Sequence, residues 1–432
     1  MIVGYIGAAI SFFICVFCLR RNKNILNPGT VFCGLWSVIL LLSSMKLYDL
    51  KDCSSATYIR LISGVVAFGV GYLLDFYIFK RKTIEIRHHY YGNATYEYIP
   101  RYTIIWIIVV CMLIEGLIGA KDSVIALMNG ANLDALRQMS RATHAATRRT
   151  IGNVIHNLVT GPMEFALYPI CAYNIINERQ KKLSAAIVAI LLLHMIKSGG
   201  RSNLIFFIIA LCVSFSFVKH HAHFTGESVN LVQKNKKRFR IVIVTLVAVF
   251  LLASISRSGQ KIIQHSYLYF AMEPTMFEQW SEIVKNNGLY GYGEASFNGF
   301  TFHVLYILKN VLDSSYPAHW YEVFNTILKV DSDWKMITNA GLPANAYASV
   351  FWYFYIDGRE FGIVALSALY GIVASYYFRK ALKHPNIKNV CLYSLILFGI
   401  FDTYVRMRFA VGEYAGGFLI LSFLIFKRER QR

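Results

Sequence analysis

The sequence lacks the signatures of several common classes of protein. Its eight cysteines form no disulfide framework, because most of them lie inside apolar stretches where a thiol serves as small apolar filler. No Ser-His-Asp spacing and no Walker motif is present. No internal repeat is evident, which argues against a transporter built from inverted repeats. The first apolar run has neither a basic start nor a small-residue cleavage site, so we expect it to be retained as a span.

Acidic residues are also scarce. The chain has 24 Asp and Glu against 44 Lys and Arg, which gives a formal net charge of +20. In a soluble protein such an excess would indicate nucleic-acid binding. Here the basic residues collect in short loops beside apolar stretches, where they fix the orientation of a membrane protein. We therefore expect no nucleic-acid partner.

What the chain has in abundance is apolar sequence. Apolar residues make up 56% of the chain, and the mean hydropathy is +0.45. They form about eleven runs of roughly the length that crosses a hydrocarbon core as a helix. We predict an all-α, polytopic integral membrane protein with a single membrane domain over 1–432. The predicted spans are 2–19, 28–45, 58–79, 102–120, 151–176, 183–197, 203–218, 241–256, 360–378, 389–405 and 413–426.

Basic residues follow every odd-numbered span. Arg20 and Arg21 follow the first span, for example, and Arg379 and Lys380 follow the ninth. Because cytoplasmic loops carry the excess of Lys and Arg, we predict that these ends are cytoplasmic. The N-terminus is then outside and the C-terminus inside.

Two long segments lie on the outer side in this topology. The first outer loop covers 121–150, and the large outer loop covers 257–359. The large loop is too polar to span a membrane, yet too aromatic for a disordered linker. We predict that it forms short amphipathic helices on the outer membrane surface. Such a loop is typical of an enzyme that acts outside the cytoplasm.

Several arginines lie on the outer side, against the charge trend. They are Arg137, Arg141, Arg148, Arg149, Arg201, Arg257, Arg359, Arg406 and Arg408. A guanidinium group grips phosphate or pyrophosphate through two parallel hydrogen bonds, so these residues are candidates for holding a lipid pyrophosphate. The alternative is that each anchors a helix end at the headgroups. Arg201, in a glycine-containing turn, and Arg257, at a span end, suit either role.

A carboxylate or an imidazole is needed if a sugar hydroxyl is to lose its proton. The outer candidates are His265, Glu273, Glu294, His303, Asp357 and Glu360. Of these we predict catalytic roles for Glu294, His303 and Asp357. An alternative for Asp357, Arg359 and Glu360 is a salt-bridged cap at a helix start, where acidic residues are favoured.

The chain offers little sign of a metal or a cofactor. Asp331 and Asp333 form a D-x-D of the kind that holds a metal with nucleotide sugars, but they lie on the outer side, where such sugars are absent. His220, His221 and His223 lie in a basic cytoplasmic loop and are expected to be solvated. We therefore expect neither a metal nor a cofactor.

Four short passages carry a resemblance to a known family. Asn27-Pro28-Gly29 leads into the second span. The stretch 197–203 places glycine, serine and arginine in a turn before a span, and 269–274 runs from tyrosine to proline. Near the end of the large loop, Asn345-Ala346-Tyr347 is followed by the aspartate-glycine run in 355–362. In these passages the chain resembles the O-antigen and capsular polysaccharide repeat-unit polymerases, often called Wzy-type.

The resemblance implies a membrane glycosyltransferase of the GT-C class in the bacterial inner membrane, with a fold shared with O-antigen ligases. It implies that a growing glycan is transferred from polyprenyl pyrophosphate to the next lipid-linked repeat unit outside the cytoplasm, without a divalent metal. Arg141 and Gly152 have the ten-residue separation of arginine and glycine described for some family members. The residues predicted to bind pyrophosphate or sugar are Arg141, Arg201, Arg257, Arg359, Arg408 and Tyr347. Membrane lipid, a chain-length regulator and a flippase of the same pathway are the expected partners.

Two other functions fit the sequence. An O-antigen ligase moves the same donor to a lipid A core, and the sequence barely separates it from a polymerase. A flippase or exporter of lipid-linked sugars would carry charges within its spans and would have a smaller outer loop. The ionisable residues within the predicted spans are few, and each lies near a span end or could pair locally. They are Asp75, Glu115, Glu164 and Asp402.

Overall fold

Helices predominate in the structure, which is a computed structural model. It describes residues 2–86, 96–130, 151–198, 200–225, 239–240, 243–246 and 261–430. An all-α fold is confirmed over these residues. Most of the predicted eighth span, together with Arg141 and Arg257, lies outside the described residues.

Two compact units make up the chain. The first unit combines Met1–Asn93, Ile263–Arg379 and Gly399–Ala415, and the second combines Ala94–Ile262, Lys380–Phe398 and Gly416–Arg432. The single membrane domain over 1–432 and the outer loops at 121–150 and 257–359 stay predictions.

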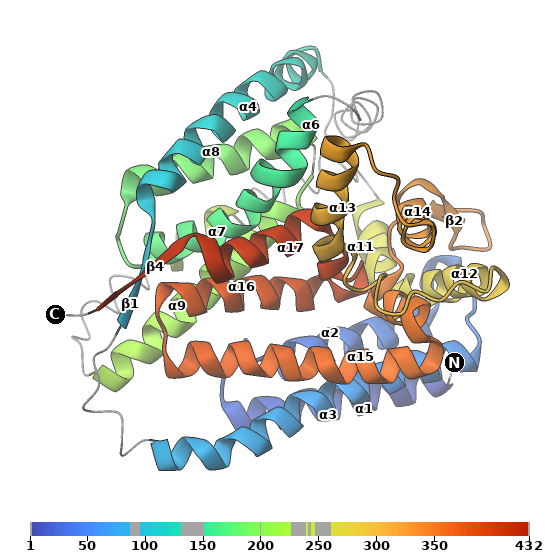
Figure 1. The fold of residues 1–432 in the computed structure, drawn as a ribbon. Coiled ribbons are helices and arrows are strands. Elements are labelled where there is room, and N and C mark those ends of the chain that lie inside the picture. Colours follow the sequence, from blue (N-terminus) through green and yellow to red (C-terminus); the bar gives the residue numbers. More distant parts are fainter. Residues whose placement is uncertain are drawn as a thin grey trace. The chain divides into compact units, whose positions relative to one another are not determined.

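The first unit is built mainly from eight helices among the described residues (Figure 1). They are α1 (Ile2–Asn22), α2 (Pro28–Met45), α3 (Ser55–Ile86), α11 (Ile262–Ala271), α12 (Glu273–Asn286), α13 (Asn298–Leu312), α14 (Ala318–Ser332) and α15 (Ser349–Lys383). Short pieces connect them, namely the 3₁₀ turns η1 (Leu47–Asp49), η4 (Asp402–Tyr404) and η5 (Arg408–Ala410), and the paired strands β2 (Lys335–Met336) and β3 (Pro343–Ala344).

The second unit contains the remaining described elements. Its helices are α4 (Tyr102–Met128), α6 (Ile151–Ile155), α7 (Gly161–Ile176), α8 (Lys181–Ser198), α9 (Ser202–Thr225), most of α16 (Ile387–Phe401) and the second half of α17 (Gly412–Leu419), with single π-helical turns at η2 (His156–Thr160) and η6 (Ile420–Leu424). Strand β1 (Tyr96–Pro100) pairs antiparallel with β4 (Phe426–Arg430).

Among the described residues, six helices are long and apolar enough to cross a membrane, which is compatible with a membrane protein. They are Ile2–Asn22, Pro28–Met45, Ser55–Leu74, Tyr102–Ala126, Ser349–Lys383 and Ile387–Tyr404. Shorter apolar helices cover Ser202–Phe217 and Gly412–Leu424. The count of eleven spans stays a prediction. A lipid surrounding favours helices, because a helix satisfies its own backbone hydrogen bonds.

The motif Asn27-Pro28-Gly29 starts α2. The side chain of Asn27 accepts a hydrogen bond from the backbone N–H of Thr30 at 2.8 Å, and its amide donates to the Thr30 hydroxyl at 2.6 Å. Pro28 occupies the first turn of α2, where no helical hydrogen bond requires the N–H that proline lacks. The local sequence therefore fixes where the second apolar helix begins.

Aromatic side chains fill the interior of each unit. In the first unit, Phe32 stacks on Phe68 with ring centroids 3.8 Å apart, and Trp36 lies 4.6 Å from Phe351. The rings come from α2, α3 and α15, and all four are buried. Burial of such large apolar groups holds helices together that are far apart in the sequence.

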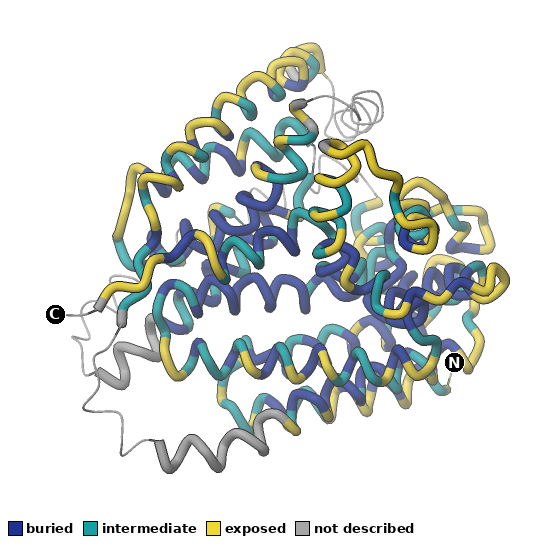
Figure 2. Tube along the Cα trace, in the orientation of Figure 1, coloured by how far each residue is buried: buried dark blue, intermediate teal, exposed yellow. Residues whose placement is uncertain are grey.

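The second unit has its own aromatic core. The rings of Phe206 in α9 and Phe398 in α16 stack at 4.6 Å, and Phe165 in α7 lies 5.7 Å from Phe206. In contrast, Figure 2 shows α4 largely exposed. Its exposed residues include Ile107, Ile114 and Ile118, which gives this helix a wide apolar face.

Helix α15 is interrupted at one point near its start. Gly358 and Arg359 leave helical geometry, and Arg359 has a positive φ of 54°. The second part, from residue 360 to 383, is ~36 Å long by the helical rise per residue, enough to cross a hydrocarbon core. The break coincides with the predicted start of the ninth span at residue 360.

Two glycines permit close packing between α3 and α15 in the first unit (Figure 1). A Cβ added at Gly71 would overlap the backbone of Ala368, and one at Gly371 would overlap the backbone of Phe68. Backbone atoms cannot move aside as the end of a side chain can. The close approach of α3 and α15 therefore requires glycine at both positions.

We predict that Gly71→Ala and Gly371→Ala each lower the free energy of unfolding by about 2 kcal/mol, the scale of overpacking a core. The melting temperature of the protein purified in detergent should fall by roughly 5 °C. Gly34→Ala in α2 is the matched control, because its nearest neighbour is the Cys15 sulfur at 3.2 Å and alanine favours a helix. Equal melting temperatures for all three variants would contradict the close approach.

Candidate functional site

The structure places Asp357 at the break in α15, buried and bound to the loop before α13. Its carboxylate accepts hydrogen bonds from the backbone N–H groups of Ala295 and Ser296, each at 2.9 Å, and from the Ser296 hydroxyl. The break also leaves the carbonyl groups of residues 356 and 357 without helical donors. The backbone N–H groups of Gly291 and Tyr292 in the loop donate to them. In this structure Asp357 holds the loop in place, and its catalytic role stays a prediction.

Arg359, at the same break in α15, binds this loop and the end of α12. Its Nη2 donates to the carbonyl oxygens of Leu289 at 2.6 Å and Val284 at 3.3 Å. The guanidinium carbon also lies 4.3 Å from the ring centroid of Tyr290 and 5.0 Å from that of Tyr355. These contacts hold the arginine in its positive-φ conformation.

The other two predicted catalytic residues also belong to the first unit. Glu294 pairs with His319, whose Nδ1 lies 2.8 Å from a Glu294 oxygen and whose Nε2 lies 2.7 Å from the Tyr290 carbonyl. The hydrogen bond that the Glu294 carboxylate accepts from His319 raises the pKa of this histidine. His303 in α13 contacts the Gly299 carbonyl through Nδ1 at 2.9 Å, and its Nε2 is buried without a described partner.

Carboxylates hold two arginines near the end of α16. Arg406 forms a bidentate pair with Asp331, with N–O distances of 3.1 and 2.6 Å. Arg408 donates from Nε to Asp402 at 2.6 Å, and both of these side chains are nearly buried. A buried guanidinium needs such a counter-charge. Arg408 therefore has a structural partner beside its predicted role in binding pyrophosphate.

Tyr347 lies within a group of aromatic rings in the first unit. Its ring centroid is 5.6 Å from that of Tyr269 and 5.9 Å from that of Tyr404, and Phe270 stacks on Tyr404 at 5.1 Å. Tyrosines carry a flat face for a sugar ring and a hydroxyl for hydrogen bonding. The stretches 269–274 and 345–347, which are far apart in the sequence, thus meet here.

Arg201 belongs to the second unit, in the turn between α8 and α9. The turn is held by Ser198, whose hydroxyl donates to the His194 carbonyl at 2.8 Å and accepts from the Gly200 N–H at 3.1 Å. Arg201 is half-buried, and its carbonyl accepts the first hydrogen bond of α9, from Ile205.

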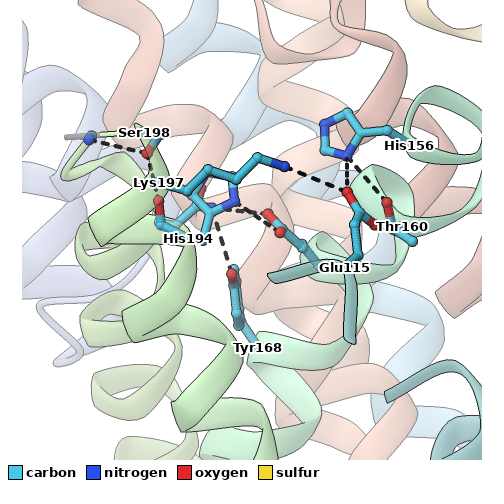
Figure 3. Close-up of polar contacts among 10 residues, drawn as sticks. Glu115, His156, Thr160, Tyr168, His194, Lys197 and Ser198 are labelled. Carbon is cyan, nitrogen blue, oxygen red and sulfur yellow. Dashed lines mark hydrogen bonds and ion pairs between the residues drawn. The ribbon is translucent and has the colours of Figure 1, made fainter. Parts of the chain in front are cut away.

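A polar pocket lies within the second unit next to this turn. The polar residues that line it are Glu115, His156, Thr160, Glu164, His194 and Lys197. They come from α4, from the π-helical turn η2, from α7 and from α8. Figure 3 shows the side chains of Glu115, His156 and Lys197 pointing toward one another. Charged and titratable groups that converge in a pocket among apolar helices are the default candidate for a functional site.

Glu164 has the most enclosed side chain among the titratable residues of this pocket. One carboxylate oxygen lies 2.9 Å from Nδ1 of His194, and the other accepts a hydrogen bond from Asn203 at 3.0 Å. The Asn203 amide lies 3.5 Å from the Tyr168 hydroxyl. Three helices thus fix one carboxylate, since Glu164 is in α7, His194 in α8 and Asn203 in α9.

Glu115 forms a second carboxylate–histidine pair. Its Oε1 lies 3.5 Å from Nδ1 of His156 and 3.6 Å from Nζ of Lys197. Nδ1 of His156 also lies 3.1 Å from the Thr160 hydroxyl. The pocket is therefore lined by two separate groups of paired side chains, Glu164 with His194 and Glu115 with His156 and Lys197.

Part of this site could be predicted from the sequence. Glu115 and Glu164 stand out as carboxylates within apolar runs, and in the structure each is paired with residues of other helices. His156, His194 and Lys197 were not predicted. The signal available was spacing, because His194 and Lys197 are three residues apart and so share a face of α8. In the part of the chain that the structure describes, no group of three His, Cys, Asp or Glu side chains could hold a metal ion.

Comparison with protein-family models, with curated proteins and with solved structures gave no match.

Glu273 in the first unit is a buried acid with an altered titration. Its side chain is fully buried, and neither carboxylate oxygen has a hydrogen bond to another described residue. Burial raises the pKa of Glu273 from 4.5 to about 8, and the nearby Ser349 hydroxyl opposes this shift. Between these two pH values the folded protein holds a proton that the unfolded chain has lost.

The free energy of unfolding should therefore be highest near pH 4.5 and fall as the pH rises toward 8, by up to about 4 kcal/mol. We predict that Glu273→Gln removes this slope and melts at a higher temperature than the wild type at pH 8. Melting curves in detergent at pH 5.5, 7.0 and 8.5 measure the effect. Glu282→Gln, at an exposed position of the same helix, should keep the wild-type slope. An unchanged slope in Glu273→Gln would show that Glu273 is ionised in the folded protein.

Proposed function

We propose that the chain is a membrane glycosyltransferase that polymerises lipid-linked oligosaccharide repeat units into O-antigen or capsular polysaccharide. It transfers the growing glycan from polyprenyl pyrophosphate to the next lipid-linked unit, outside the cytoplasm. In this proposal about eleven helices of the GT-C class cross a bacterial inner membrane, with the N-terminus outside and the C-terminus in the cytoplasm.

The polar pocket of the second unit is the observation that carries the proposal. Transfer of a glycan from a pyrophosphate needs a group that accepts the proton of the acceptor hydroxyl and positive charge that stabilises the departing pyrophosphate. The pocket supplies carboxylates and imidazoles for the first task and Lys197 for the second. Arg201 follows in the turn after α8 and adds a guanidinium group suited to phosphate.

The same helices offer an apolar surface for a lipid. Helix α4 contributes Glu115 to the pocket and also carries the exposed side chains of Ile107, Ile114 and Ile118. Met112 and Ile190 give the pocket itself apolar walls. A substrate with a polar head and an isoprenoid tail matches this combination of surfaces.

The directions of the helices agree with a site on the outer side. A Cβ at Gly116 would contact Leu193 and one at Gly119 would contact Lys197, so α4 and α8 run in the same direction. In the predicted topology both helices end outside, and α7 begins outside. The pocket residues then extend from the middle of three spans toward their outer ends, the side on which we propose that lipid-linked units are joined.

The first unit supports the proposal in a different way. It folds the segment 262–348 into four short helices with many aromatic residues. The rings of Tyr269, Tyr347 and Tyr404 form a group of the kind that stacks against sugars. Binding roles for Arg359 and Arg408, and catalytic roles for residues in this unit, stay predictions.

Deletion of the gene, followed by gel analysis of the surface glycan, tests the function. We expect the ladder of long chains to disappear while a single repeat unit remains on its acceptor. Loss of all capped glycan would favour an O-antigen ligase instead. Accumulation of lipid-linked units inside the cell would favour a flippase.

Complementation of the deletion strain tests the arginines. We predict that Arg201→Ala lowers the amount of polymer by about 100-fold, the usual effect of removing one group that stabilises the leaving charge, and that adding Arg257→Ala abolishes it. Arg20→Ala, at an exposed position after α1, should restore normal glycan. Protein in the membrane is measured for each variant. Normal long chains from the double variant would remove both arginines from the site.

A further inference from the structure

We propose that His194 accepts the proton of the acceptor hydroxyl and that Glu164 is the positioning residue that holds it. This inference rests on the proposed function. It assigns the chemistry to a carboxylate–imidazole pair inside the second unit that is not among the catalytic residues predicted from the sequence.

Both carboxylate oxygens of Glu164 have partners that hold them in place. His194 occupies one oxygen at 2.9 Å, and Asn203 occupies the other at 3.0 Å. The Glu164 side chain is only 10% exposed. A carboxylate in α7 that is bound from two other helices cannot rotate freely, so it fixes the plane and position of the imidazole.

The two ring nitrogens of His194 differ in their surroundings. An ionised carboxylate only accepts hydrogen bonds, so Nδ1 of His194 carries the proton that faces Glu164. In the neutral ring the lone pair is then on Nε2. His194 lines the pocket, and 28% of its side chain is exposed. The base is therefore accessible, while its orienting partner is enclosed, which is the arrangement of an activated general base.

Three candidates in the first unit are less suited. His319 pairs with Glu294, but its Nε2 is 2.7 Å from the Tyr290 carbonyl, so both nitrogens are engaged. Nε2 of His303 is buried. Asp357 already accepts hydrogen bonds on both oxygens. His194 combines a fixed ring with an accessible nitrogen.

The acceptor hydroxyl gives its proton to Nε2 of His194, and its oxygen forms a bond to the anomeric carbon of the donor glycan. The bond from that carbon to the pyrophosphate oxygen breaks, and polyprenyl pyrophosphate leaves with the electron pair. Glu164 stabilises the imidazolium ion, and Lys197 offers positive charge to the leaving group. The proton later passes from His194 to solvent.

Glu164 is not the only charged group near His194. Glu115 from α4, His156 from η2 and Lys197 from α8 line the same pocket. All three stay in place when Glu164 is changed. A difference in pH dependence between the wild type and Glu164→Gln therefore reports on the carboxylate that contacts His194.

The test uses the full chain, purified in lipid nanodiscs, with lipid-pyrophosphate-linked repeat units isolated from the deletion strain. His194→Asn keeps an amide where Nδ1 donated, but it has no basic nitrogen. We predict that it lowers kcat by about 100-fold or more with little change in KM. His384→Asn is the matched control in the same unit, away from the pocket, and should polymerise at the wild-type rate.

Glu164→Gln gives a second readout that a merely structural role would not move. Without the carboxylate the imidazolium is less stable, so the acidic limb of the kcat profile should move to lower pH, with a smaller loss of kcat than in His194→Asn. An unmoved acidic limb would contradict the positioning role. Melting temperatures of all variants show whether they are folded.

The outcomes separate this inference from the proposed function. Polymer from both the wild type and His194→Asn at equal rates would overturn the role of His194 and leave the function standing. If the wild type makes no polymer and gene deletion leaves the glycan unchanged, the function itself is wrong, and the role of His194 falls with it. Loss in His194→Asn alone supports the inference.

Discussion

The second unit depends on how the Glu164 carboxylate is neutralised. A charge among apolar helices is stable only if it is paired and hydrogen-bonded, and the partners here come from different helices. His194 in α8 and Asn203 in α9 both bind the carboxylate of α7. The same requirement that brings these helices together places an imidazole at a pocket. Glu115 is paired in a similar way with His156 and Lys197. The pocket therefore results in part from the pairing of charged side chains.

The first unit meets a related constraint by different means. Where α15 is interrupted, two carbonyl groups lose their helical donors, and the loop before α13 supplies N–H groups to them. Asp357 and Arg359 bind that loop from the same break. Arg408 is likewise held by Asp402. The arginines that the sequence marks as phosphate-binding candidates thus have protein partners in this structure, whereas the pocket of the second unit contains a half-exposed ammonium group beside two imidazoles.

Much of the fold could be predicted, because apolar runs of sufficient length become helices wherever they occur. The second apolar run was predicted at 28–45, and α2 has those bounds; the predicted start of the ninth span falls at the break in α15. The site was harder. Glu115 and Glu164 are visible as acids in apolar runs, but pairing of residue 164 with 194 and 203 depends on how three helices pack, and no local pattern encodes that. The conformation of Arg359 depends equally on tertiary contacts.

A structure by electron cryo-microscopy of the protein with a lipid pyrophosphate-linked repeat unit bound would test the site directly. We expect the pyrophosphate within ion-pair distance of Lys197 or Arg201, with space for an acceptor hydroxyl at Nε2 of His194. A pyrophosphate bound instead in the first unit, with Glu164, His194 and Asn203 remote from any substrate atom, would exclude the pocket of the second unit as the site of transfer.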